Sequence, residues 1–260
     1  MFELRESLPK RTRFLFELGG MIVILIAWQL VAMRIASIAI LPTPLEVLRS
    51  FPELHFQDLI VVNTAYSIRI NLLGYIWATA LAVPLGFAVG MFTPMGAVFN
   101  RFLEAIRYIP LTAVTGLFIA WFGIYMNMKV QFLAFGIFVY LLPVVVARVK
   151  ELDEIYVQTA ETLGASKWQI IRKVFIPGVL SKVSDDIRVL TAISWTYIIV
   201  AELINNEGGI GALIFRASRQ SRLDKVFACL FVIILIGIAQ DKIFIWLDRR
   251  LFKYKYANDK

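Results

Sequence analysis

Side chains that could do chemistry are few in this 260-residue chain. It has one histidine, His55, and one cysteine, Cys229, which lies inside an apolar run. A lone cysteine cannot form an intrachain disulfide, and neither residue has the companions that a metal site needs. No Ser–His pair can be built around a single outward histidine. We therefore expect no catalytic centre, no metal site and no cofactor bound to this chain itself.

Two acids, Asp185 and Asp186, lie beside a strongly apolar segment, where charged groups are costly and often functional. One interpretation pairs them with Lys182 or Arg188, three or four residues away on the same helix. The other interpretation has one acid lining the inner vestibule of a transmembrane path. Both interpretations stay open at this stage.

Farther along the same segment, Glu202 precedes a glycine-rich turn, Asn205–Gly211, whose glycines permit positive φ angles. The Glu202 carboxylate either accepts hydrogen bonds from backbone amides of that turn or gates an outer mouth. Thr191, Ser194 and Tyr197 are candidates for lining a path. Against that role, hydroxyls on a membrane helix often bond to carbonyls of their own helix.

The composition indicates a membrane protein. Hydrophobic residues make up 59% of the chain, whereas soluble domains contain about 45–50%. Asp, Glu, Lys and Arg are absent from residues 70–100, 108–128 and 130–147, and each run approaches or exceeds the roughly 20 residues that span a bilayer. The chain is predicted to be an all-α polytopic membrane protein, a single domain over residues 1–260. Its six spans are predicted at about residues 18–33, 68–92, 109–122, 130–149, 178–203 and 226–247.

The basic residues predict the orientation of these spans. The chain has 27 Lys and Arg and a net charge of +8. Of the 27, 19 fall on the side of the six spans that holds both termini, and eight fall on the other side. Because positive charge accumulates in cytoplasmic loops, both termini and the loop at residues 151–177 are predicted to be cytoplasmic.

That loop contains a polar, amphipathic segment, Ile155–Gly178, between two apolar spans. Gly164 is predicted to end a first helix as a left-handed C-cap. Ser166 is predicted to cap a second short helix, Lys167–Val174. Pro177 cannot continue that helix and should mark the return to the next span. On one face of the first helix lie four apolar side chains, with Gln158 on another side: Tyr156, Val157, Ala160 and Leu163.

The segment resembles the EAA loop of ABC importer permeases. That pattern runs roughly Glu-Ala-Ala, three residues, Gly, nine residues, Ile, two residues, Leu-Pro. Here Gln158-Thr159-Ala160 stands for the triplet, Gly164 for the glycine and Ile176-Pro177 for the closing pair. The acid is replaced by Gln158 and the second position by Thr159, which puts in doubt any role that needs a negative charge there. The alternative is an ordinary loop between membrane helices.

Other segments resemble the nitrate/sulfonate/taurine/bicarbonate branch of these permeases, so the resemblance covers about residues 41–251. They are Leu41-Pro42-Thr43-Pro44, Arg107-Tyr108-Ile109-Pro110, Trp121-Phe122-Gly123, Ala201-Glu202 and Gly208-Gly209-Ile210-Gly211.

The resemblance implies an inner-membrane permease subunit, without enzymatic activity of its own, that imports a small solute by alternating access. It implies a dimer of permease chains, a pair of separate ATPase subunits that bind ATP and Mg, and a periplasmic or lipid-anchored substrate-binding protein. The loop would fit a groove on the ATPase, anchored by Tyr156, Val157, Ala160 and Leu163, with Gly164 permitting the turn. Membrane lipids surround the spans, and no nucleic acid is expected as a partner.

Two other classes of protein compete with this interpretation. A secondary transporter often shows inverted repeats and paired intramembrane charges, and the sequence shows no convincing repeat. A non-transporting membrane scaffold would not require a docking loop, and that loop is the best-matched segment.

Overall fold

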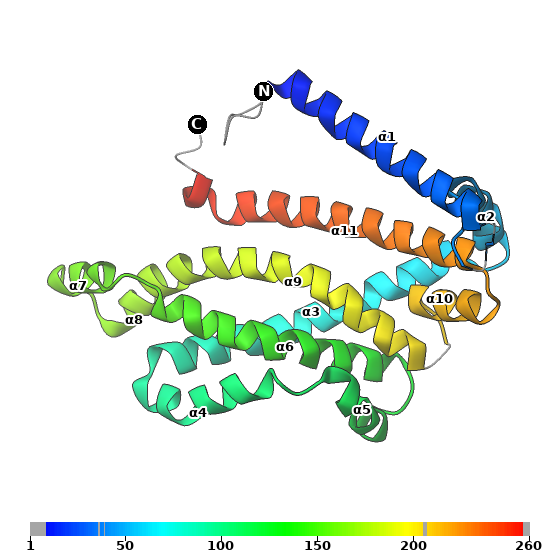
Figure 1. Cartoon of the computed structure of the whole chain (residues 1–260). Helices are drawn as coiled ribbons and strands as arrows, with labels where there is room; N and C mark the ends of the chain where they lie inside the picture. The colour runs from blue at the N-terminus through cyan, green and yellow to red at the C-terminus, as the bar shows by residue number, and fades with distance from the viewer. Residues whose placement is uncertain (1–8, 36, 39, 205–206, 257–260) are drawn as a thin grey trace. The chain divides into compact units, whose positions relative to one another are not determined.

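The computed structural model describes residues 9–35, 37–38, 40–204 and 207–256. Throughout these ranges the regular secondary structure is helical, without a strand (Figure 1). Within the chain that we expected to form one domain, the structure distinguishes two compact units. The first comprises residues 1–60 and 213–231, and the second comprises residues 61–212 and 232–260.

The first unit contains α1 (Lys10–Ile35), α2 (Pro44–Phe56), most of α10 (Ile210–Arg219) and the start of α11 (Leu223–Leu251). A capping box starts α2, because Thr43 and Glu46 each bond to the other's backbone N–H. The indole N–H of Trp28 donates to the Pro42 carbonyl at 3.0 Å. The Trp28 ring also lies 5.5 Å from the ring of Phe227, which fastens α1 to α11.

Charged side chains of this unit tie α2 to the start of α11. The Arg222 guanidinium donates to Glu53 and to Asp224, each at 2.8 Å. Lys225 donates to Asp58 at 2.7 Å and pairs with Glu53 at 2.6 Å. The hydrogen bonds from Arg222, followed by those from Lys225, lower the pKa of Glu53 to about 2. The network therefore stays charged at neutral pH.

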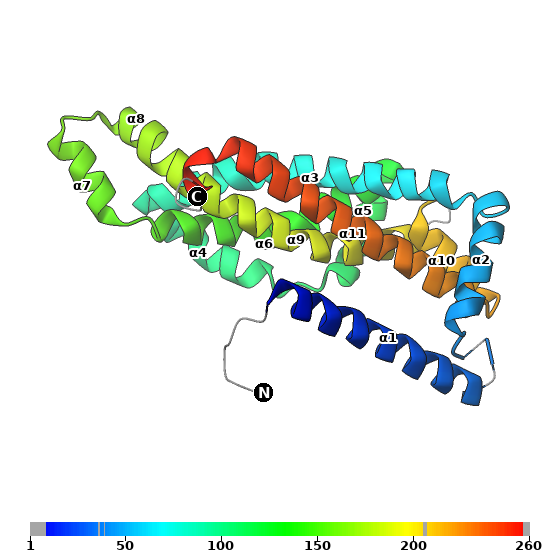
Figure 2. The same ribbon diagram turned by 90° about the horizontal axis from the view of Figure 1, so that it is seen from above.

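The second unit holds most of the spanning helices. In chain order its elements are α3 (Ile60–Met91), α4 (Thr93–Ile106), a 3-10 turn (Leu111–Val114), α5 (Thr115–Phe122), α6 (Met126–Lys150), α7 (Glu154–Thr162), α8 (Lys167–Ile170), a π-helical segment (Ile171–Phe175), α9 (Ile176–Ile204), the end of α11 and a 3-10 turn (Lys253–Tyr256). Helices α3, α6 and α9 run side by side, and α7 and α8 project from one end of α6 and α9 (Figures 1 and 2).

Glycines let α3 approach α6 closely. A Cβ atom added at Gly86 would lie 2.5 Å from a methyl carbon of Val145, and one at Gly90 would lie 2.7 Å from Val149. Gly74 meets Leu133 in the same way. Small residues at such positions are typical of helix pairs in lipid, where close packing replaces the hydrophobic driving force.

Among the residues that the structure describes, five helices are long and apolar enough to cross a membrane, and a sixth span results if one bent helix pair is counted as a single crossing. Helices α1, α3, α6, α9 and α11 coincide with five of the predicted spans: 18–33, 68–92, 130–149, 178–203 and 226–247. The helices extend beyond the predicted ends in most cases, by as many as eight residues at the start of α1 and of α3.

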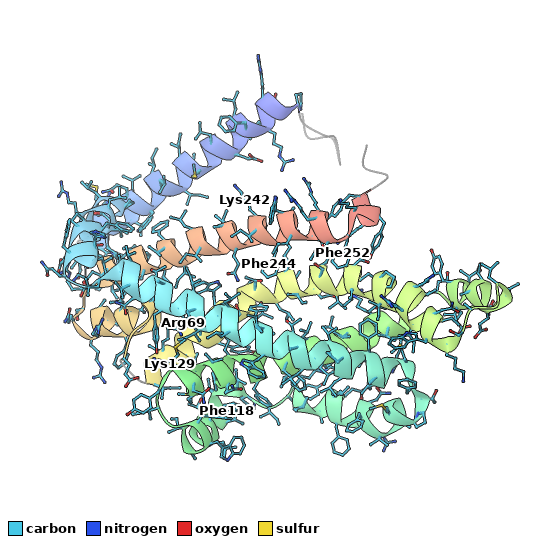
Figure 3. All side chains as sticks on the ribbon, turned by 180° about the vertical axis from the view of Figure 1, so that it is seen from behind. Arg69, Phe118, Lys129, Lys242, Phe244 and Phe252 are labelled. Atoms are coloured by element: carbon cyan, nitrogen blue, oxygen red, sulfur yellow. The ribbon has the colours of Figure 1, made fainter. Side chains whose placement is uncertain are left out.

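The remaining segment, residues 109–122, is not a straight span. Its 3-10 turn and α5 together reach only about 20 Å, short of the roughly 30 Å hydrocarbon core. Helix α4 and the segment Leu111–Phe122 are together long and apolar enough for one crossing, and they are bent by 95° relative to each other. Pro110 lies at the break, since it lacks an N–H and disfavours helical backbone in the residue before it. Beyond the break, Phe118 of α5, which Figure 3 labels, packs onto Phe132 of α6.

Candidate functional site

The projecting loop is held in shape by local hydrogen bonds. Gly164 follows α7 with a φ of +76°, as predicted for a left-handed C-cap. Its N–H donates to the Glu161 carbonyl at 2.9 Å, and the N–H of Ala165 donates to the Ala160 carbonyl at 3.0 Å. This pair of bonds is a Schellman motif, which satisfies the last carbonyls of the helix. The turn is therefore defined by the backbone alone.

The second helix of the loop starts as predicted, at Ser166. Ser166 and Gln169 form a capping box, in which the Ser166 N–H donates to the Gln169 side chain at 2.7 Å. Both ends of the four-residue connection between α7 and α8, residues 163–166, are thus fixed by hydrogen bonds between residues close in sequence.

The prediction that Pro177 ends this helix is wrong. The N–H of Ile176 donates to the carbonyl of Ile171, five residues earlier, so residues 171–175 form a π-helical turn. A proline ring clashes with the carbonyl four residues before it in a regular α-helix, and the wider π turn gives this ring room. One continuous helix of 38 residues therefore runs from Lys167 to Ile204, from the loop through the span.

Large apolar side chains project from the loop into the surroundings. Leu163 is 81% exposed, the most of the four, which are Ile155, Tyr156, Leu163 and Trp168. Of the other predicted anchors, Val157 and Ala160 are half-buried, and α7 packs on α8 and the π-helical turn. Gln158 is exposed. Ile155 and Trp168 were not among the predicted anchors, although bulky apolar residues in a polar segment are themselves a signal.

The base of the loop is tied to the C-terminal end of α11. The Tyr254 hydroxyl donates to the Pro177 carbonyl, and the Lys255 ammonium donates to Asp185 at 2.7 Å and to Asp248 at 3.0 Å. Burial opposes the charged form of Lys255, but these two carboxylates raise its pKa above the ordinary value. The hydrogen bond from the Tyr256 hydroxyl to Asp248 likewise raises the pKa of Tyr256.

The expected pairing of Asp185 and Asp186 with residues of their own helix is wrong. Asp186 receives two hydrogen bonds from Arg148 of α6, at 2.7 and 2.8 Å. Asp185 pairs with Lys255, and Arg188 pairs with Asp241 of α11. For Asp186 and Arg188, a partner on the neighbouring helix prevails because a planar guanidinium holds a carboxylate with two parallel bonds. Asp185 instead accepts a single hydrogen bond from the Lys255 ammonium.

The hydroxyl candidates on α9 divide into two kinds. Thr191 and Ser194 are buried, and both bond to carbonyls of their own helix, as one of the two interpretations expected. Ser194 also accepts a hydrogen bond from the Asn71 amide of α3 at 2.9 Å. Tyr197 is half-buried and stacks on Tyr140 of α6, with ring centroids 6.3 Å apart.

A polar chain that the sequence did not suggest extends from Asn71 across to α11. The Gln240 amide donates to Asn71 at 3.4 Å, and the Trp195 indole donates to Gln240 at 3.1 Å. These three residues and Tyr75 line an otherwise apolar cavity of about 460 Å³ between α3, α9 and α11. These hydrogen-bonded side chains give the cavity wall neutral polar groups, whereas the rest of the wall is apolar.

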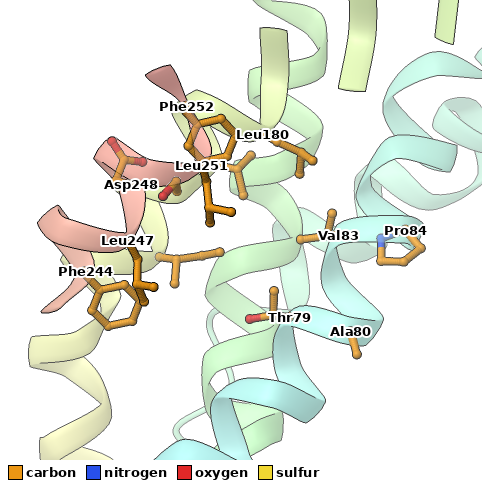
Figure 4. Close-up of a pocket in the computed structure, with 13 residues that line it drawn as sticks. Thr79, Ala80, Val83, Pro84, Leu180, Phe244, Leu247, Asp248, Leu251 and Phe252 are labelled. Carbon is orange, nitrogen blue, oxygen red and sulfur yellow. The ribbon is translucent and has the colours of Figure 1, made fainter. Parts of the chain in front are cut away.

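A second cavity, of about 440 Å³, lies between the same three helices nearer the loop (Figure 4). Its wall is mainly apolar, with Val83 and Pro84 of α3 facing Leu180 of α9 and Leu247 of α11. Asp248 is its charged lining residue, and that acid is already bonded to Lys255 and Tyr256.

At the other end of α9, Glu202 is completely buried. One carboxylate oxygen accepts the hydroxyl of Ser67 at 2.6 Å, and the other accepts the N–H of Gly211 at 2.7 Å. The interpretation that Glu202 bonds to the glycine turn is therefore confirmed. Gly208 and Gly209 have positive φ angles, as expected, whereas residues 205 and 206 of the predicted turn lie outside the described residues.

Lys129, the fourth residue of α6, is also completely buried and lies at this end of the helices (Figure 3). Its ammonium lies 5.2 Å from the centre of the Tyr66 ring and near enough to Glu202 for electrostatic attraction. Lys129 is one of the eight Lys and Arg residues that the predicted topology places in loops on the side opposite the termini. The signal for its burial is its position, alone between two charge-free runs.

Comparison with known proteins now identifies the family. Residues 61–253 match the family described as the binding-protein-dependent transport system inner membrane component. The chain is 31% identical to a protein assigned as an ABC transporter permease in Methanocaldococcus jannaschii, over 88% of this chain and 90% of that protein. It is 29% identical to a permease assigned to aliphatic sulfonate transport in Bacillus subtilis, over 95% and 91%. It is 26% identical to the taurine transport system permease of Escherichia coli, over 94% and 90%.

Solved structures agree on the fold. A chain of the inward-facing MetNI methionine ABC transporter superposes with a TM-score of 0.58 at 16% identity, covering 72% of this chain and 94% of that one. A chain of an amino acid ABC transporter gives 0.57 at 17% identity, covering 77% and 97%. The helical order, the projecting loop and these relatives agree, and the chain belongs to the family of binding-protein-dependent transport system inner membrane components, as an ABC importer permease.

Proposed function

We propose that this permease works with a separate ATP-hydrolysing subunit, which binds ATP and Mg and docks on the loop formed by α7 and α8. The observation that carries the proposal is the group of four apolar side chains exposed on that loop: Ile155, Tyr156, Leu163 and Trp168. Burying one such side chain in the interface with a partner contributes about 1.5–3 kcal/mol to the free energy of binding. An amphipathic helix seated in a groove of a partner uses these contacts.

The rigidity of the loop supports a mechanical role. Because the capped turn at Gly164 leaves few alternative conformations, little entropy is lost when a partner binds. The continuous helix from Lys167 to Ile204 then joins the docking surface to the whole length of a membrane span. Closure of the ATPase subunits would displace the loop, tilt α9 and open the path toward the outside, which is alternating access.

The permease would act as a dimer, most simply of two copies of this chain, around a central path. Both termini and the loop would lie in the cytoplasm, in agreement with the distribution of Lys and Arg. A substrate-binding protein on the outer side would deliver the solute and set most of the specificity. The sites proposed for the path, Asp185, Asp186 and Tyr197, lie on α9, which a dimer would bring near the central axis.

The solute is proposed to be a small anion of the sulfonate type, such as taurine or an alkanesulfonate. Support comes from the two relatives named for sulfonate and taurine transport. The cavity of about 460 Å³ between α3, α9 and α11 also carries neutral hydrogen-bond donors on its wall: Asn71, Tyr75 and Gln240. Amide and hydroxyl donors can hold a sulfonate weakly enough for release, whereas a fixed cation would hold it more tightly.

Photo-crosslinking in native membranes tests the docking proposal. A photoreactive amino acid replaces Leu163 in the test variant and Tyr125 in the control variant. Tyr125 is also exposed, and it lies at the start of α6, the end of that helix away from the loop. We expect an adduct from position 163 that mass spectrometry identifies as an ATP-binding cassette subunit, and none from position 125. Equal adducts from both positions, or none with such a subunit from position 163, would contradict the proposal.

A further inference from the structure

The turn before α10 is fastened to two other helices by three side chains. Asn63 of α3 accepts the N–H of Gly209 at 2.8 Å, and Ser67 of α3 accepts the N–H of Ile210 at 2.9 Å. Glu202 of α9 accepts the N–H of Gly211 at 2.7 Å. Three successive amides are thus bonded to side chains, whereas a helix start usually leaves them to a single cap or to water.

Glu202 is the centre of this arrangement, because it also accepts the hydroxyl of Ser67. A Cβ atom added at Gly209 would lie only 2.2 Å from the carboxylate carbon of Glu202, and one added at Gly211 would lie 2.9 Å from the Cβ of Glu202. The glycines therefore allow the carboxylate to lie directly against the backbone of the turn. Ser67, Glu202, Ile210 and Gly211 are all buried, so the bonds among them are shielded from water, whereas the bond from Gly209 to Asn63 is partly buried.

The position of Glu202 along α9 gives this contact its significance. Glu202 is the third residue from the end of α9, and the other end of the same helix continues into the loop at Lys167. The 38-residue helix has a length of about 57 Å. Two residues beyond Gly211, at Leu213, the chain enters the first unit. Glu202 therefore connects the far end of the helix that carries the loop to the turn at Gly209–Gly211, within the second unit.

We propose that Glu202 is a positioning residue that makes the glycine turn and the first turn of α10 move together with α9. The proposal rests on the proposed function, because it supposes that the ATPase moves the loop. Glu202 touches no solute in this role; it transmits the displacement of α9 to the turn at Gly209–Gly211. Lys129, buried close by, attracts the carboxylate of Glu202 electrostatically.

Hydrogen exchange of the turn, measured by mass spectrometry on the assembled complex in nanodiscs, tests this role. The complex is examined without nucleotide and trapped with ATP and vanadate, so no solute is needed. In the wild type we expect trapping to change exchange at residues 207–213 by about tenfold, equivalent to about 1.4 kcal/mol in the opening of the turn.

The variant Glu202→Gln keeps the shape of the side chain but replaces an acceptor oxygen with a donor. We expect its complex to assemble with the ATPase and to hydrolyse ATP at the basal rate, while exchange at the turn is equally fast with and without nucleotide. The matched control is Asp241→Asn, which makes the same chemical change at an acid that bonds Arg188 of α9 and not the turn. It should respond as the wild type does.

The proposal is overturned if the turn of the wild-type complex does not respond to trapping, or if Glu202→Gln responds as the wild type does. If Glu202→Gln does not fold, Ser67→Ala decides: it removes one bond to Glu202 and one to Ile210, and an unchanged response in it overturns the proposal. Failure of the wild-type chain to assemble with any ATPase is a different result, which overturns the proposed function and the inference with it.

Discussion

The two ends of the helix Lys167–Ile204 differ in what they leave exposed. At the loop end, apolar side chains such as Leu163 and Trp168 project outward, and the turn is held by bonds within the loop. At the other end, Glu202 and Lys129 are completely buried, and the turn is held by side chains from other helices. The loop end leaves apolar surface uncovered, which the proposed function assigns to a partner, and the other end is held by contacts within the chain. Substitutions at the Glu202 end should therefore affect stability, and those at the loop end should affect assembly.

The largest effect on stability is expected from Glu202→Ala. It leaves the N–H of Gly211 and the hydroxyl of Ser67 without their acceptor and removes a carboxylate that attracts the buried Lys129, so the free energy of unfolding should fall by about 3–5 kcal/mol. Unfolding in detergent micelles titrated with SDS measures it. Tyr156→Ala, at an exposed position of the loop, should change stability by less than about 0.5 kcal/mol. Similar values for the two variants would remove the contrast between the ends.

A smaller effect is expected from Arg148→Ala, near the loop end. Asp186 loses its two-pronged partner on α6, so the free energy of unfolding should fall by about 1–3 kcal/mol. The matched control is Arg13→Ala, whose ion pair with Glu17 is exposed on a single helix and should contribute at most about 0.5 kcal/mol. The same titration compares them, and equal losses would show that the interhelical pair adds nothing.

Gly164→Ala tests whether the loop turn depends on its left-handed backbone. An alanine at a φ of +76° is strained by about 1 kcal/mol, so the loop should be cleaved faster by a protease while global stability hardly changes. Gly116→Ala is the control, since that glycine lies in α5 with no positive φ and open space around it. Equal cleavage of both variants and the wild type would mean that the turn is not held by this conformation.

The weakest effect concerns the tie between the C-terminal 3-10 turn and α9. The pKa values of Lys255 and Tyr256 are raised in the folded chain. Their contribution to holding the 3-10 turn is therefore complete at a pH below the ordinary pKa values, and it is lost as the pH rises through the raised pKa values. A spin label at Lys253→Cys, in a Cys229→Ala background, should become more mobile above about pH 10.5. Adding Lys255→Met should make the label mobile already at pH 8. A label equally immobile in both chains would show that Lys255 does not hold the segment.

The sequence predicts what depends on neighbours along the chain. Gly164 and Ser166 were placed correctly because a C-cap and a capping box involve residues only a few positions apart. Pro177 was misjudged because the π turn that accommodates it has no distinct residue pattern. The partners of Asp185 and Asp186 depend on which helices pack together, and no spacing within one helix contains that information. Residues 109–122 form part of a bent helix pair with α4, and Pro110 lies at the break.

The most direct test of the docking loop compares Leu163→Asp with Gln158→Glu. Both variants add one negative charge to α7, but at 100° per residue Gln158 lies well away from the side of Tyr156 and Leu163. The complex with the ATPase and the binding protein is assembled in nanodiscs, and ATP hydrolysis is measured. Because a carboxylate at position 163 would be buried in an apolar groove, we predict a loss of association and at least about a tenfold fall in hydrolysis, with Gln158→Glu close to the wild type. Full association and unchanged hydrolysis of Leu163→Asp would contradict the account.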